Sequence, residues 1–358
     1  MVADYTKKLL KRQDLSEDEA FDAVNKLMSG SQPDSAIAAF LTALAAKGET
    51  AGEITGCVKA MRAASVKVRP KVFGPLVDTC GTGGDRVKTF NVSTLSALVA
   101  ASCGVSVAKH GNKAVTSRCG SADFLEAVGV NIMCDARGVE KCIEQAGLGF
   151  MFAPLFHPAM KAVMPVRKAL GFRTVFNILG PLSSPANADT QLIGVFDESL
   201  VEKLSLVLKN LGTKKALVVH GLDSSGQGAM DEISTIGNTK AAAVGFSCPP
   251  LLSPADFGLS QADSSLVAAN ASPEDHLRVA SEILRARQSS PEQKARMEMV
   301  LANSSAVLVL AGKAKDFADG VGLARDALQS GAALSTLEKF VEVSGGDFAK
   351  FAAFERMA

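Results

Sequence analysis

The residues best suited to chemistry are three glycines and an acid that follow a short apolar segment. The run Asp78–Asp85 directly follows the apolar segment Val72–Val77; it contains Gly81, Gly83 and Gly84 and ends in Asp85. Glycines lack the Cβ atom that would keep an anion away from backbone N–H groups, so such a turn can hold phosphate or diphosphate. A carboxylate beside phosphates suggests a sugar hydroxyl or a cation as well. A turn without any ligand is the alternative, and the spacing fits neither a P-loop nor G-x-G-x-x-G.

Two further polar clusters suit phosphate oxygens. Asn91–Thr94 precede an apolar helical segment. They either cap that helix or, together with the free N–H groups at its N-terminus, bind diphosphate. The Ser93 hydroxyl could also ligate Mg²⁺. The segment Lys109–Asp123 interleaves cations with Gly, Asn, Thr and Ser, which favours phosphate binding over a solvated basic loop. Within it, Ser121 could instead cap the next helix.

Two acids and one arginine complete the candidate residues. Asp231 and Glu232 follow a predicted loop, 221–230, and they are either solvent-facing or suited to Mg²⁺, which takes few carboxylates. Asp223 in that loop could be an extra ligand. Arg167, near the end of a helical stretch, could hold a carboxylate in a bidentate pair or pair with a structural acid.

Two patterns along the chain must position these residues. The first seventy or so residues predict helices only, with capping boxes at Ser16–Glu19 and Thr50–Glu53. Their core is undersized, so we expect them to pack on another subunit or on a later segment. From Lys71 onward, short β-rich runs alternate with helices, which predicts a largely parallel sheet covered by helices. Ligands of such sheets gather at the carboxyl ends of the strands.

The composition narrows the function classes. The 358 residues are 47% apolar and 21% charged, and a net charge of +1 gives no global support for a nucleic-acid-binding face. The seven cysteines contain no C-x-x-C pair, so we expect reduced thiols in a cytoplasmic protein. Met1–Gln13 is polar and unlike a secretory signal. The longest mostly apolar stretch, 95–108, is too short to span a bilayer.

Taken together and in this order, these residues resemble the anthranilate phosphoribosyltransferases of tryptophan biosynthesis. The resemblance covers nearly the whole chain. It implies an α/β protein with a small N-terminal all-helical domain, residues 1–70 joined in space by part of 165–190. Hinges would connect it to a larger α/β domain, residues 71–358, whose mostly parallel central sheet is covered by helices. It also implies a cytoplasmic homodimer formed through the helical domain.

The resemblance further implies which residues bind the substrates and the metal. Mg²⁺, two ions per subunit, would be held by Ser93, Asp231 and Glu232. Anthranilate would be held by Gly81, Asn112, His157 and Arg167, and the catalytic residues would be Lys109, His110 and Arg167. Phosphoribosyl diphosphate would be held by Gly81, Gly84, Asp85, Thr89, Asn91, Val92, Ser93, Thr94, Lys109, His110, Gly111, Asn112, Lys113, Ala114, Val115, Thr116, Ser117 and Ser121. The amine of anthranilate would then displace diphosphate from C1 of the ribose.

Departures from the family and two rival functions remain open at this point. The loop 221–230 is longer than is usual, and Cys119 and Lys113 stand where the family often has Ser and Arg. A pyrimidine nucleoside phosphorylase of the same implied fold is one rival. Asp231 and Glu232 disfavour it, because phosphorolysis has no diphosphate that requires Mg²⁺. A non-catalytic relative that binds nucleic acid would be expected to show a basic surface and to lack these acids.

Overall fold

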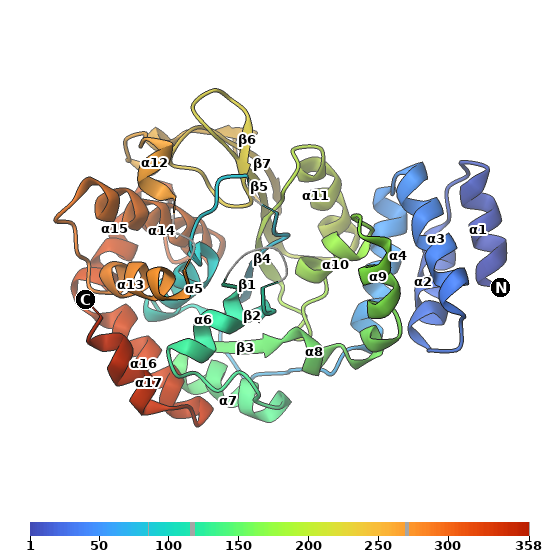
Figure 1. Ribbon diagram of the computed structural model, residues 1–358. Helices are drawn as coiled ribbons and strands as arrows, with labels where there is room; N and C mark the ends of the chain where they lie inside the picture. The colour runs from blue at the N-terminus through green and yellow to red at the C-terminus, as the bar shows by residue number, and fades with distance from the viewer. Residues whose placement is uncertain (85, 115–118, 269–271, 358) are drawn as a thin grey trace.

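The N-terminal part of the chain forms four helices, as the computed structural model shows (Figure 1). The structure describes residues 1–84, 86–114, 119–268 and 272–357. The helices are α1 Val2–Leu10, α2 Glu17–Met28, α3 Asp34–Lys47 and α4 Ala51–Ala64. Both predicted capping boxes are confirmed: Ser16 and Thr50 each accept a hydrogen bond from the backbone N–H of a glutamate, whose carboxylate accepts one in return. These caps fix where α2 and α4 begin.

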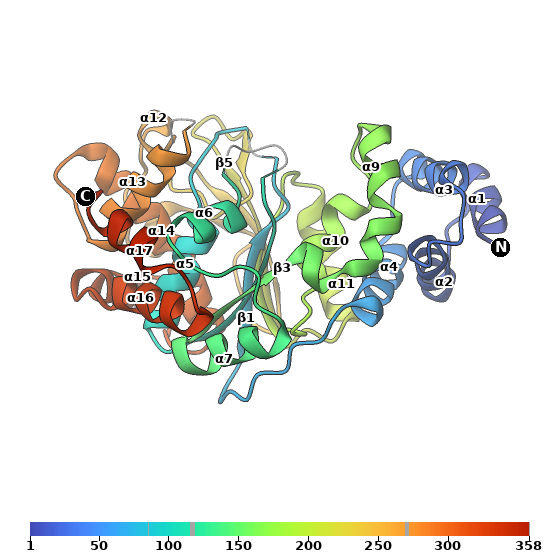
Figure 2. The same cartoon turned by 60° about the horizontal axis from the view of Figure 1, so that its bottom comes forward.

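The buried faces of these helices pack against later segments of the chain. Their apolar side chains form one continuous cluster with those of α9 Met164–Leu170, α10 Phe176–Leu182 and α11 Leu200–Asn210. The same cluster reaches one face of the central sheet through residues such as Ile193 and Val218. Figure 2 shows α10 and α11 between the sheet and the N-terminal helices. The small helical part therefore does not depend on its own residues alone for a core.

The centre of the molecule is a mixed sheet with the strand order β3-β2-β1-β4-β5-β7-β8, to which β6 is added beside β5. The first five strands of that order are mutually parallel. The strands are β1 Leu76–Gly81, β2 Ser106–Gly111, β3 Leu148–Phe152, β4 Thr190–Gly194, β5 Lys215–Leu222, β6 Gly228–Met230, β7 Thr239–Val244 and β8 Leu251–Leu252. The predicted parallel sheet is confirmed, and an antiparallel edge of β6, β7 and β8 extends it.

Three boundaries predicted from the sequence are wrong, and each error moves a candidate site residue. β1 begins at Leu76 and runs through Gly81, so the first residues of the glycine-rich run are strand instead of turn. β2 continues to Gly111, which places Lys109 and His110 in the sheet. The predicted loop 221–230 is a hairpin formed by the end of β5 and by β6. In all three places, pairing with a neighbouring strand satisfies backbone groups that the local composition assigned to a loop.

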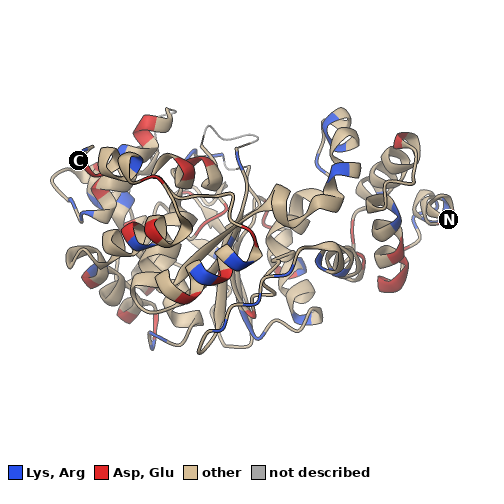
Figure 3. Cartoon of the chain, turned by 90° about the horizontal axis from the view of Figure 1, so that it is seen from below, with Lys and Arg blue, Asp and Glu red and all other residues tan. Residues whose placement is uncertain are grey.

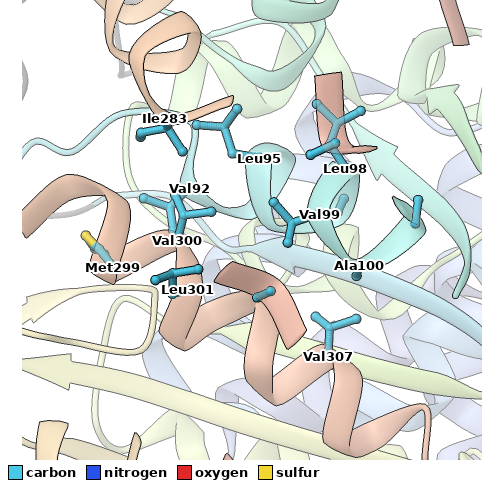
Figure 4. Packing of buried hydrophobic residues seen from close by; sticks show 14 of the residues in the cluster. Val92, Leu95, Leu98, Val99, Ala100, Ile283, Met299, Val300, Leu301 and Val307 are labelled. Carbon is cyan, nitrogen blue, oxygen red and sulfur yellow. The ribbon is translucent and has the colours of Figure 1, made fainter. Parts of the chain in front are cut away.

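The face of the sheet away from the N-terminal helices is covered by α5 Val92–Ser102 and α14 Pro291–Leu310. Figure 4 shows Val92, Leu95 and Val99 of α5 near Val300 and Val307 of α14. The long helix α14 lies directly on the sheet, where it contacts β4 and β5. The other helices of the described chain are α6 Ser121–Ala127, α7 Ala136–Ala146, α8 Ala153–Phe156, η1 Pro158–Ala162, η2 Pro254–Phe257, α12 Ser264–Val267, α13 Pro273–Leu284, α15 Phe317–Gln329, α16 Ala332–Ser344 and α17 Phe348–Glu355.

Positions occupied by charged residues of both signs are spread over both parts of the molecule (Figure 3). This distribution agrees with the net charge of +1. Among the helices that the structure describes, none is long and apolar enough to cross a bilayer.

Candidate active site

Two neighbouring cavities open where the carboxyl ends of β1 and β2 meet the segments around them. The first cavity has a volume of about 320 Å³ and is lined by the glycine-rich turn, the start of α5, the end of β2, and Asp231 and Glu232. The second cavity, of about 350 Å³, lies toward α9 and α10. Their shared wall consists of Cys80, Gly81, Thr82, His110, Gly111 and Asn112. A molecule bound in one cavity would therefore lie beside a molecule bound in the other.

The glycine-rich turn is shaped by its packing on Asp231. A Cβ added to Gly81 would lie 2.0 Å from Oδ2 of Asp231, so only glycine fits there. The backbone N–H of Gly83 donates to that same Oδ2 at 2.7 Å. Gly83 has a φ of +73° and open space around its Cβ position, so its glycine is needed for backbone conformation. The sequence interpretation explained the glycines by ligand access alone and missed this contact.

Lys109 projects from β2 into the first cavity and is almost fully buried. Its Nζ donates to the carbonyl oxygen of Thr79 at 2.6 Å and to Oγ of Ser93 at 3.2 Å. Burial lowers the pKa of Lys109, while the nearby Asp78 carboxyl opposes that shift. Burial also raises the pKa of Asp78, to about 7, with the charge of Lys109 acting in the opposite direction. The site therefore holds a cation in a low-dielectric setting, where its attraction for phosphate is strong.

Asp231 and Glu232 lie directly after β6 and face the start of α5. Oε1 of Glu232 accepts the backbone N–H of Ser93 at 3.2 Å. Burial raises the pKa of Glu232 to about 8, and the charge of Asp231 adds to the effect. Two crowded carboxyl groups of this kind fit a divalent cation, which would relieve their mutual repulsion. Within the described ranges no group of three or more His, Cys, Asp or Glu side chains could hold a metal, but Mg²⁺ needs only one or two carboxylates.

The other predicted residues around the first cavity differ in what they present to it. Thr89 is half-buried and lines the cavity, and Nδ2 of Asn91 lies 3.5 Å from both Sγ of Cys119 and Nδ1 of His276. Val92 packs into the core (Figure 4), so only its backbone can serve a ligand. The hydroxyl of Thr94 is buried without a hydrogen-bond partner among the described residues.

The segment that follows β2 only partly matches the predicted phosphate-binding loop. Lys113 borders the first cavity, but it is exposed and its ammonium forms an ion pair with Glu126 of α6 at 2.9 Å. Ser121 is the first residue of α6 and not its cap. The N-cap is Gly120, and Asp123 accepts the backbone N–H groups of Gly120 and Ala114. Gly111 and Asn112 line both cavities. Four predicted residues lie outside the described chain: Asp85, Val115, Thr116 and Ser117.

The second cavity is more apolar and contains one arginine from α9. Arg167 lies with its guanidinium carbon 5.4 Å from the centre of the Phe176 ring, and Nη1 donates to Sδ of Met164 at 3.5 Å. Burial lowers the pKa of Arg167, which leaves its strongly basic guanidinium charged. The structure gives Arg167 no ion pair with a described acid. This arrangement favours the carboxylate-holding interpretation over a structural pair.

His110 lines both cavities and His157 lines the second, and their ring centres are 5.0 Å apart. Nδ1 of His110 lies 3.2 Å from the carbonyl oxygen of Gly180, so it carries the proton and Nε2 is the acceptor. Neither Nε2 of His110 nor Nε2 of His157 has a hydrogen-bond partner in the described part of the chain. Burial lowers the pKa of His110 to about 3 and that of His157 to about 4. Both rings are therefore neutral acceptors at pH 7.

Sequence reasoning missed some residues near the site and misplaced one. His276, from α13, lines the first cavity. The sequence around it indicates only that a helix begins after Ser272, and nothing in it indicates a binding residue. Arg173 lies against Gly84, and no sequence motif singled it out. Asp223 is not directed at a metal: it pairs with Arg86 and accepts hydrogen bonds from Ser225. The expectation of an extra ligand there is wrong, because the hairpin uses that carboxylate to close its own turn.

The fold agrees with the comparisons to known proteins. The helical bundle domain of the glycosyl transferase family matches residues 3–65, and its α/β domain matches residues 74–334. The anthranilate phosphoribosyltransferase of Methanothermobacter thermautotrophicus is 49% identical over 331 residues, which cover 92% of this chain and 94% of that protein. The chain belongs to the anthranilate phosphoribosyltransferases.

Solved structures support the same assignment. The anthranilate phosphoribosyltransferase of Thermus thermophilus has a TM-score of 0.87 at 40% identity, covering 96% of this chain and 99% of its own. The enzyme from Saccharomyces cerevisiae, solved in complex with PRPP (phosphoribosyl diphosphate) and Mg, has a TM-score of 0.85 at 29% identity, covering 96% of this chain and 98% of its own. The predicted family, fold class and activity are confirmed.

Proposed function

We propose that this chain transfers the 5-phosphoribosyl group from phosphoribosyl diphosphate in the first cavity to the amine of anthranilate in the second cavity. The observation that carries the proposal is the shared wall, from Cys80 to Thr82 and from His110 to Asn112. At Gly81 and Gly111 this wall has no side chain between the two cavities, so C1 of the ribose and the attacking nitrogen can approach each other there. One side of this wall is rich in phosphate-binding donors, and the other is apolar with one arginine.

The phosphate side supplies fixed donors to the group whose charge grows as the bond breaks. The ammonium of Lys109 is the clearest of these. The N–H groups of Thr82, Gly83 and Ser93 line the same cavity but already donate to oxygen atoms of the protein. Donors that are already held in place need no reorganisation when diphosphate departs, so their stabilisation is felt in the transition state. Lys109 is held by Thr79 and Ser93 before substrate arrives.

A divalent metal fits beside these donors, and we propose that the reaction depends on Mg²⁺. Asp231, Glu232 and Ser93 are the residues that would hold it, with two ions per subunit as the expected number. When bound, Mg²⁺ supplies Lewis-acid stabilisation of the diphosphate charge. The buried Glu232 carboxyl and the adjacent Asp231 support this assignment, because a cation removes the cost of holding two like charges together.

The apolar side of the site positions anthranilate. Arg167 would bind its carboxylate through two parallel N–H donors, while Phe176 and Met164 contact the ring. The unpartnered Nε2 of His110 would accept a hydrogen bond from the amine and aim its lone pair at C1. The C–N bond forms as the C1–O electron pair leaves with diphosphate, and the nitrogen, now positively charged and strongly acidic, then releases one proton to water. With a pKa of about 3, His110 orients the amine and is too weak a base to drive the step.

Assembly, domain boundaries and location complete the proposal. We place a helical domain at residues 1–70, joined in space by part of 165–190, and an α/β domain at residues 71–358. The contacts of α3 with α9 and of α4 with α10 support that grouping. We propose a cytoplasmic homodimer that forms through the helical domain, where Leu10 is an exposed apolar side chain.

A fluorescence assay of anthranilate consumption tests this function. The native protein is mixed with anthranilate, phosphoribosyl diphosphate and MgCl₂, and we expect the anthranilate signal to fall as product forms. Excess EDTA should abolish turnover, and added Mg²⁺ should restore it. Asp231→Asn keeps an oxygen for the Gly83 N–H but loses the charge, so it should need far more Mg²⁺ for half-maximal rate. Full turnover in EDTA would refute the metal assignment.

A further inference from the structure

Arg173 lies in the link between α9 and α10, where its side chain stacks on an aromatic ring. Its guanidinium carbon is 3.6 Å from the centre of the Phe196 ring, which is the geometry of a close cation–π contact. The structure gives Arg173 no hydrogen bond to a described residue, so this stacking is its main contact besides the one with Gly84 described next. Phe196 itself is only partly buried and belongs to the segment that follows β4.

The other side of the guanidinium lies on the backbone of the glycine-rich turn. A Cβ built on Gly84 would be 2.2 Å from Nη2 of Arg173 and 3.7 Å from Cβ of Phe196. Gly84 also has a φ of +102°, so the turn at this point depends on glycine twice. Arg173 and Phe196 thus both lie against the turn at Gly84, and neither is among the residues that line the first cavity.

Further hydrogen bonds tie the same turn to the end of β4. The backbone N–H of Phe196 donates to Oγ1 of Thr82 at 3.0 Å, and the backbone N–H of Thr82 donates to the carbonyl of Gly194 at 3.0 Å. The carboxylate of Asp231 accepts the N–H of Gly83. The turn is therefore held both by this carboxylate and by its contact with the Phe196–Arg173 stack.

We propose that Arg173 is a positioning residue for phosphoribosyl diphosphate binding. Stacked on Phe196, it lies against Gly84 and holds the turn in the conformation that lines the first cavity. The proposal rests on the proposed function of that cavity. Because Arg173 lines neither cavity, it acts through the turn and not by touching substrate. Its loss should therefore weaken the binding of phosphoribosyl diphosphate and leave the anthranilate side unchanged.

Steady-state kinetics of Arg173→Ala, Arg173→Lys and Phe196→Leu test the proposal, with the exposed Arg137 on α7 replaced in the control Arg137→Ala. We expect the KM for phosphoribosyl diphosphate to rise roughly 5- to 30-fold in the three variants, as for loss of one stacked cation. The KM for anthranilate, kcat and the thermal midpoint should stay close to those of the control. Millimolar guanidinium, but not ammonium, should partly restore Arg173→Ala. The double variant Arg173→Ala/Phe196→Leu should have a KM for phosphoribosyl diphosphate no higher than that of either single variant, because each single substitution already removes the same stacking contact.

An unchanged KM for phosphoribosyl diphosphate in Arg173→Ala would overturn the proposal, provided that the native enzyme is active. Full recovery in Arg173→Lys would also overturn it, since lysine keeps the charge but not the planar stack. If both KM values rose together and the thermal midpoint fell, Arg173 would have a purely structural role. A native protein without activity on anthranilate and phosphoribosyl diphosphate would instead reject the proposed function, and this inference with it.

Discussion

The close approach of Gly81 to Asp231 makes Gly81→Ala a sharp test of the site. The added methyl carbon would lie 2.0 Å from Oδ2 and 2.7 Å from Cγ of Asp231, far inside van der Waals contact. The backbone of β1 is fixed by its ladder with β4 through Gly194, so the strand cannot move away. The carboxylate must therefore rotate, and it then loses the N–H of Gly83 at 2.7 Å.

The size of the effect follows from that lost contact. A hydrogen bond to a charged acceptor contributes about 1.5–3 kcal/mol, which converts to roughly a 10- to 100-fold loss in kcat/KM at 1.4 kcal/mol per tenfold. Displacing a proposed Mg²⁺ ligand should also raise the Mg²⁺ concentration needed for half-maximal rate. Both quantities can be read from the anthranilate fluorescence assay over a Mg²⁺ titration.

A matched glycine elsewhere separates this effect from a general response to a methyl group. Gly322 in α15 has no heavy atom within 4 Å of its Cβ position and no positive φ, so Gly322→Ala should leave kcat/KM unchanged. It should slightly raise the thermal midpoint, because alanine is the better helix former. If Gly81→Ala kept native kcat/KM and native Mg²⁺ dependence, the packing of Asp231 would have no part in catalysis.

Three further predictions concern the remaining charged groups of the site. Arg167→Ala should raise the KM for anthranilate by about 10- to 100-fold while the KM for phosphoribosyl diphosphate holds, and an unchanged anthranilate KM would reject the carboxylate contact. Lys109→Met should lower kcat/KM at least about 100-fold, because it removes the cation that faces diphosphate. It should also lower the unfolding free energy, because the buried Asp78 loses a nearby positive charge and the Thr79 carbonyl loses its donor. A native kcat/KM in folded Lys109→Met would reject the role of this lysine in the reaction. For His157, whose folded pKa of about 4 lies below its unfolded value, native stability should fall as pH drops from about 6.5 toward 4, by up to about 3 kcal/mol. Denaturant unfolding measured over this pH range should show a smaller fall in unfolding free energy for His157→Gln than for the native protein. The comparison with the native protein is needed because the raised pKa values of Asp78 and Glu232 change stability with pH in the opposite direction.

Much of the fold could be predicted because its signals are local. The capping boxes at Ser16 and Thr50 depend only on residues that are three positions apart. The parallel sheet followed from alternation of strand and helix. Strand ends could not be predicted: β1 and β2 extend into polar residues because neighbouring strands satisfy their backbone groups there.

The candidate site, like the fold, could be predicted only in part from the sequence. Lys109, Asn112 and Arg167 were predicted, and all three line the cavities. Lys113 was predicted too, yet its ammonium pairs with Glu126 on α6 at the border of the first cavity. Sequence composition gives the type of a side chain but not its direction, which depends on where the backbone places its Cβ atom.

By itself, the sequence determined the chemical inventory: glycines for a tight turn, a lysine and an arginine for anions, and two adjacent acids for a metal. The tertiary structure alone decided which of them meet. Asp231 lies 148 residues from Gly83, yet its carboxylate fixes that turn, and Arg173 reaches the same turn from the link between α9 and α10. Such contacts arise from strand order and from packing across the whole core, and no local run of residues encodes them.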